Sequence, residues 1–183
     1  MARDKKTWEM KFKCVKKFMT VMDTMGADDE LIECCSTMLR NPVVFDNNVK
    51  EVKSVIPFEI EGLKDSTTKV TEDHLIGMSN MVLYMFRNGL HRTWETVEDF
   101  KNTLKALNVL LPVTKEMNDN GTFKKGWQFK SGNINDCIKW DKKLKSVGIT
   151  ELICKETGEK VSVEDAWATW FEGNKEFLTT NGK

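Results

Sequence analysis

The sequence predicts a mainly helical α+β fold, with about six helices and two or three small antiparallel hairpins. Three observations support this fold class. Apolar residues recur every three or four positions over several stretches, as in helices with one buried face. Capping residues and glycines mark the ends of those stretches. Short apolar segments bounded by turn residues lie between them, and these are typical of short strands.

The first predicted helix covers about residues 8–25 and ends at Gly26. Its apolar stripe is broad enough to pack on a core along its whole length. The predicted buried face comprises Trp8, Phe12, Val15, Met19 and Met22, widened by Cys14, Phe18, Val21 and Met25. Asp28 caps a second helix, which Pro42 closes.

Residues 43–60 fit either a short helix or a strand, and their Val and Ile content favours a strand over 52–60. Thr71 has the position of a cap for a third helix, because two acidic residues follow it in the first turn. Gly89 would end that helix.

Thr96 and Asp99 resemble a capping box for a fourth helix, which the leucine spacing extends to Pro112. A turn at 118–121 then joins two short predicted strands. Residues 134–144 form the fifth predicted helix, which Gly148 closes.

The last predicted element is a β-hairpin with its turn at 157–159, followed by a helix that starts at Ser162 or Val163. This hairpin and helix, residues 151–167, resemble the small DNA-binding repeat near the C-termini of phage-encoded homing endonucleases. Ser162 and Ala166, four positions apart, carry the resemblance together with the turn. A module boundary near Gly148 is expected, which divides the chain into a helical α+β core domain at 1–148 and a small hairpin–helix module at 149–183, either separate or packed on the same core. The residues from Gly173 onward are expected to be loosely held at the chain end.

The adjacent pair Asp73 and His74 resembles the metal-and-histidine centre of HNH-type nucleases. That resemblance implies that Asp73 holds Mg²⁺ or Mn²⁺, that His74 activates water, and that His91 is a further metal ligand. The sequence departs from the family, because Asn88 and His91 are only three residues apart. In the structural alternative, the acids complement a helix dipole and His74 makes a local hydrogen bond.

Basic and aromatic residues alternate between 124 and 145. Ammonium groups neutralise phosphates, and exposed rings can stack on bases. The predicted DNA contacts are Lys124, Lys125, Trp127, Lys130, Lys139, Lys142, Lys143, Lys160 and Ser162. The same alternation also fits a strand whose aromatic side chains point inward while its lysines point outward.

The formal net charge is zero, which argues against a uniformly basic nucleic-acid binder. The charges are nevertheless segregated, since residues 1–17 hold seven Lys or Arg and two acids, whereas residues 23–33 are acidic. Five cysteines without framework spacing fit reduced thiols. No apolar run approaches the roughly 20 residues of a membrane span. We therefore expect a cytoplasmic protein without a membrane contact, located in the host cytoplasm if a phage encodes it.

Together these features predict an intracellular, phage-type DNA-binding protein that would, if catalytic, be a metal-dependent endonuclease. The alternative is a small non-enzymatic protein that binds a host or structural protein through a Met- and Trp-rich helical face. The chain contains ten Met and six Trp, which favours this alternative. Phosphate-loop, dinucleotide-binding and structural-zinc motifs are absent from the sequence.

Overall fold

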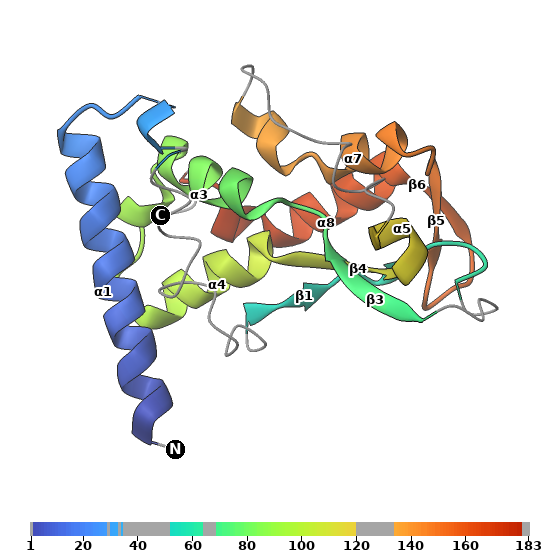
Figure 1. Cartoon of the computed structure of the whole chain (residues 1–183), viewed down its shortest axis with the longest axis horizontal. Coiled ribbons are helices and arrows are strands. Elements are labelled where there is room, and N and C mark those ends of the chain that lie inside the picture. The colour runs from blue at the N-terminus through green and yellow to red at the C-terminus, as the bar shows by residue number, and fades with distance from the viewer. Residues whose placement is uncertain are drawn as a thin grey trace.

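The computed structural model describes residues 2–28, 30–32, 34, 52–63, 69–119 and 134–180 (Figure 1). These residues form a mainly helical α+β fold with two small three-stranded sheets, which confirms the predicted fold class. The long helix α1 (Ala2–Thr24) runs along one edge of the molecule, and the hairpin of strands β5 (Glu151–Cys154) and β6 (Lys160–Ser162) lies at the opposite edge (Figure 1).

Helix α1 forms because its apolar side chains share one stripe, as predicted. Trp8, Val15, Met19 and Met22 are all buried in the hydrophobic core. They pack toward the 3₁₀ helix η2 (Leu90–Arg92) and helix α4 (Val97–Leu107). The chain leaves α1 at Gly26, whose φ of 64° is a left-handed conformation that favours glycine.

The predicted second helix is confirmed where the structure describes it. Asp28 accepts a hydrogen bond from the backbone N–H of Leu31 (2.9 Å), which is the expected capping contact. Residues 30–32 and 34 are helical. Residues 35–51, which include the predicted end of this helix at Pro42, lie outside the described residues.

The first sheet has the order β1–β4–β3, with strands β1 (Ser54–Val55), β4 (Val109–Thr114) and β3 (Val70–His74). The pair β1–β4 is parallel and the pair β3–β4 is antiparallel. The predicted helix starting at Thr71 is therefore wrong, because Thr71 pairs with Val113 in this sheet. Helix α3 (Met78–Arg87) begins only after Gly77 and ends before Gly89, at the predicted stop.

The predicted fourth helix is correct at its start and too long at its end. Thr96 and Asp99 form the capping box of α4. Asn108 ends the helix, and its side-chain amide donates to the carbonyl of Val52 (3.3 Å). Pro112 lies inside the central strand β4. It is tolerated there because β1 pairs only with Val109 and Leu110, so a Pro without an N–H removes no bond to β1.

The second sheet has the order β2–β5–β6 and is antiparallel throughout. Its strands are β2 (Phe58–Glu59), β5 (Glu151–Cys154) and β6 (Lys160–Ser162). The predicted hairpin is confirmed, and Gly158 in its turn has a φ of 74°. The preference for β structure over 52–60 is also confirmed, although one strand from this segment joins each sheet.

The predicted fifth helix is divided in two. The 3₁₀ helix η3 (Ile134–Ile138) precedes helix α7 (Trp140–Ser146), and Gly148 follows with a φ of 84°. A short helix α5 (Lys115–Asp119) begins after β4, where the sequence predicted the approach to a turn.

Helix α8 (Val163–Leu178) packs against α4 and α7. Its end is not loosely held as predicted, because Leu178 is fully buried and its carbonyl accepts a hydrogen bond from the Tyr84 hydroxyl (2.9 Å). The buried side chains of α8 belong to the same hydrophobic cluster as those of α1, α3 and α4.

Candidate functional site

Asp73 lies on strand β3 and forms an inward ion pair. The Nζ atom of Lys143, on α7, lies 2.7 Å from Asp73 Oδ2 and donates to the carbonyl of His74 at 2.6 Å. Only 8% of the Lys143 side chain is exposed. Lys143 was predicted to contact DNA, but the structure places its ammonium group on the carboxylate that was predicted to hold a metal ion.

His74 follows Asp73 on the same strand. Successive side chains of a strand point to opposite faces, so the two residues do not share one edge as the predicted helix start would have allowed. Burial lowers the pKa of His74 below 6.5, while the charge of Asp73 and the polar side chain of Asn108 oppose this shift. The imidazole is therefore mainly neutral at pH 7, as a general base requires.

His91 lies in a different part of the fold, on η2. Its ring is buried and stacks on Phe86, with 5.8 Å between the ring centroids. Its Nε2 atom is 3.7 Å from Asp23 Oδ2, at the end of α1. Among the described residues, no three His, Cys, Asp or Glu side chains form a group that could hold a metal ion. The structure therefore places His91 with Asp23 and does not bring it to Asp73 and His74.

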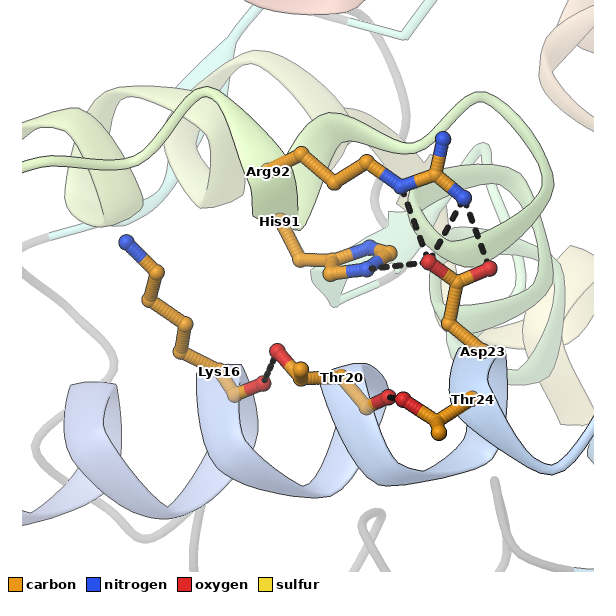
Figure 2. Close-up of polar contacts among 6 residues, drawn as sticks. All are labelled: Lys16, Thr20, Asp23, Thr24, His91 and Arg92. Atoms are coloured by element: carbon orange, nitrogen blue, oxygen red, sulfur yellow. Dashed lines mark hydrogen bonds and ion pairs between the residues drawn. The ribbon is translucent and has the colours of Figure 1, made fainter.

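Two polar contacts fasten the C-terminal half of α1 to the core, and Figure 2 shows the first of them, between Asp23 and Arg92. Arg92 donates two hydrogen bonds from Nη2 (both 2.6 Å) and one from Nε (2.9 Å) to the carboxylate of Asp23. About two turns before Asp23, the ammonium group of Lys16 donates to the carbonyl of Trp94. Because both contacts reach the segment 92–94, α1 is held in one position on the core.

The other described lysines among the predicted DNA contacts are paired with acids. Lys139 and Lys142 both pair with Asp136, at 3.3 and 2.9 Å. Lys160 pairs with Glu61 at 2.8 Å. Lys124, Lys125, Trp127 and Lys130 lie outside the described residues.

Ser162 caps helix α8. Its Oγ atom accepts a hydrogen bond from the backbone N–H of Asp165 (3.1 Å) and donates to the Asp165 carboxylate (2.7 Å). The whole hairpin and helix, residues 151–178, contain three lysines against seven Asp or Glu. A module of this charge repels phosphate groups unless a local cluster overcomes the net field.

The outer face of α1 is the feature that the sequence interpretation missed. We define the outer stripe as Met10, Cys14, Lys17, Val21 and Met25. All five side chains are exposed, including 62% of Met10, 46% of Val21 and 70% of Met25. Met25 continues the helical spiral, because its N–H donates to the carbonyl of Val21. The prediction that Cys14, Val21 and Met25 widen the buried face is therefore wrong.

The spacing of the outer stripe, in steps of 4, 3, 4 and 4, could have separated it from the buried stripe. The sequence prediction instead treated the buried stripe and the outer stripe of α1 as one broad buried face. Among the described tryptophans, Trp8, Trp94, Trp140 and Trp170 are buried and Trp167 is half-buried, so none of these five contributes to the outer stripe.

Comparisons with protein families, with characterised protein sequences and with solved structures find no match to this chain. None of the helices in the described ranges is long and apolar enough to cross a membrane.

Proposed function

We propose that this chain is a binding protein that contacts another protein through the outer stripe of α1. The observation that carries the proposal is the clustering of exposed apolar side chains. Among the described residues, six large apolar side chains are exposed, and three of them belong to the outer stripe, namely Met10, Val21 and Met25. A cluster of exposed apolar side chains is typical of a protein interaction site, whereas single exposed apolar side chains scattered over a surface are not.

The placement of α1 also supports a binding role. The contacts of Asp23 with Arg92 and of Lys16 with Trp94 hold the helix in place before any partner arrives. A partner that binds a preordered helix loses less conformational entropy on association than one that must order it. Flexible methionine side chains then adapt to the partner's surface.

The chemistry of the outer stripe defines the partner. Lys17 lies within the stripe, and Lys13 is exposed beside it. A complementary surface therefore presents an apolar row with acidic side chains along its margin, as an amphipathic helix can.

Site-specific photo-crosslinking tests this function. A photoreactive amino acid replaces Val21 in the stripe, and a matched control replaces Thr20, which is exposed on the neighbouring polar face. We expect protein crosslinks from position 21, in the cells that produce the chain, and few from position 20. Equal yields from the two positions, or crosslinks to nucleic acid alone, would contradict the proposal.

DNA binding, with metal-dependent cleavage if the chain is catalytic, is the second candidate function. The observation that favours it is the hairpin and capped helix at 151–178, which have the arrangement that the resemblance to phage homing endonucleases requires. Titration of duplex DNA at about 50 and 200 mM salt separates the two candidates, because phosphate contacts weaken steeply with salt. Plasmid cleavage with Mg²⁺ or Mn²⁺, lost in His74→Ala, would support the catalytic form.

A further inference from the structure

We infer that the junction of α1 and α4 binds an oxyanion, a phosphate or carboxylate group, at the ammonium group of Lys11. The site lies on the core side of α1 and is separate from the outer stripe, so the inference does not depend on the proposed function. Three observations carry it. The side chain of Lys11 is turned inward, its ammonium group lacks an acceptor among the described residues, and a second lysine lies at the same aromatic ring.

Lys11 occupies a core-facing position of α1. It lies three residues after Trp8 and four before Val15, which are both buried, so all three share one face of the helix. Only 3% of Lys11 is exposed. A lysine at the edge of a fold ordinarily extends its flexible stem until the ammonium group reaches water. Lys13 and Lys17 on the outer side of α1 are exposed in this way, whereas Lys11 is not.

The buried ammonium group of Lys11 has no hydrogen-bond acceptor in the part of the chain that the structure describes. It lies over the ring of Trp8, with 5.0 Å between Nζ and the ring centroid. A cation–π contact offsets only part of the cost of removing an ammonium group from water. At the start of α4, the carboxylate of Asp99 accepts from Thr96 in the capping box. An anion bound at Lys11 would supply the missing acceptor.

Lys101, on α4, brings a second positive charge to the same ring. Its Nζ atom is 5.3 Å from the centroid of Trp8. Phe100 packs edge-on against Trp8, with 6.3 Å between the ring centroids, and lies 6.0 Å from the ring of Phe12. Two ammonium groups beside one ring attract an anion, and aromatic walls that exclude water strengthen the attraction. Charge-assisted hydrogen bonds from ammonium groups suit phosphate and carboxylate oxygens.

An anion at this position would fasten α1 nearer to its N-terminus than the contacts of Lys16 and Asp23 do. Because Lys11 belongs to α1 and Lys101 to α4, an oxyanion held by both would join the two helices. A ligand that binds only the folded chain stabilises it. We therefore expect inorganic phosphate to slow amide hydrogen exchange over residues 8–14 and to raise the melting temperature.

Titration of the purified full-length protein with inorganic phosphate, and separately with acetate, tests the site. Sodium chloride keeps the ionic strength constant, and calorimetry measures the binding. We expect one saturable site per chain with a Kd of about 0.1–10 mM. Lys11→Met should weaken binding roughly tenfold or more and Lys101→Met roughly threefold or more. Lys105→Met, exposed on the same helix as Lys101, is the matched control and should change nothing. Binding of phosphate alone, of acetate alone or of both identifies the kind of oxyanion.

Thermal unfolding gives a second readout. Without phosphate or acetate, Lys11→Met should melt at a higher temperature than the wild type, because an apolar side chain of similar length replaces a buried unpaired charge. Saturating phosphate should raise the melting temperature of the wild type and leave that of Lys11→Met unchanged. No saturable binding of either anion by the wild type, or equal binding by the wild type and Lys11→Met, would overturn the inference. If Lys11→Met does not fold, equal binding by Lys101→Met and Lys105→Met overturns it.

Discussion

Asp23, in the last turn of α1, and Arg92, in η2, join two segments that are 69 residues apart in the sequence. Arg92 also holds the pKa of Asp23 below its ordinary 3.8, mainly through the hydrogen bonds to the carboxylate. Bidentate pairing fixes geometry as well as charge. The relationship explains how a helix at the edge of the molecule keeps one face on the core and leaves another face uncovered.

Replacement of Arg92 by Ala should loosen the end of α1. We expect faster amide hydrogen exchange at residues 21–24 and a lower melting temperature, with a smaller effect for Arg92→Lys, which keeps the charge. Because the pKa of folded Asp23 is depressed, the pair's contribution is present above pH 3.8 and is lost as the pH falls below that value. Identical exchange in Arg92→Ala and the wild type would show that the pair does not hold the helix.

His91 makes the free energy of unfolding depend on pH in a range above that of Asp23. Burial lowers the pKa of His91 below 6.5, while Asp23 opposes this shift and Arg92 adds to it. Just below pH 6.5, the His91 imidazole therefore binds a proton more readily in the unfolded chain than in the folded chain. The free energy of unfolding is then at its full value above pH 6.5 and decreases as the pH falls below it.

Urea unfolding between pH 5 and 7.5 measures this dependence. His74 has a pKa shifted in the same direction by burial, so each residue contributes part of the slope. We expect His91→Phe and His74→Gln each to reduce the slope, and the double variant to remove most of it. An unchanged slope in His91→Phe would show that this imidazole takes up its proton equally in both states.

Removal of Lys143 should be costly. Lys143→Met leaves the Asp73 carboxylate without its ammonium partner, and we expect a loss of about 2–4 kcal/mol in the free energy of unfolding. Lys142→Met is the matched control on the same helix, where the partly exposed pair with Asp136 contributes about 0–1 kcal/mol. Chemical denaturation measures both, and equal effects would contradict the inward position of Lys143.

Ser162 should matter for stability through its capping contact. Ser162→Ala removes the acceptor for the Asp165 N–H, and we expect a loss of about 1 kcal/mol. Ser162→Thr keeps a hydroxyl at the same position and should restore most of it. Thermal unfolding of the three proteins makes the comparison. Wild-type stability of the Ala variant would show that the cap contributes little to α8.

Local signals predicted part of the fold well. The capping box at Thr96, the turn around Gly158 and the buried stripe of α1 each depend on residues close in the chain, and each lies where the sequence places it. Strand β3 was mistaken for a helix start because Thr71 and the two following acids also fit a capped first turn. Its pairing with β4 depends on residues about 40 positions away, which no local pattern records.

The candidate site was harder to predict, because side-chain direction is set by tertiary packing. Lys142 and Lys143 are adjacent and chemically identical, yet 41% of the Lys142 side chain is exposed while Lys143 is buried on Asp73. In α1, two apolar rows lie side by side, and their spacing predicted that both are buried, although the outer stripe is exposed. Which row would be covered depends on where η2 and α4 lie.

Methionine oxidation tests most directly whether the outer stripe is an interface. In dilute purified protein, Met10 and Met25 should oxidise at least tenfold faster than buried Met19 and Met81, because their thioethers are exposed. In the cells that produce the chain, we expect Met10 and Met25 to be protected several-fold. Met117 on α5, outside the stripe, should keep its rate. Equal oxidation of Met10 and Met25 under dilute and cellular conditions would contradict a protein partner on α1.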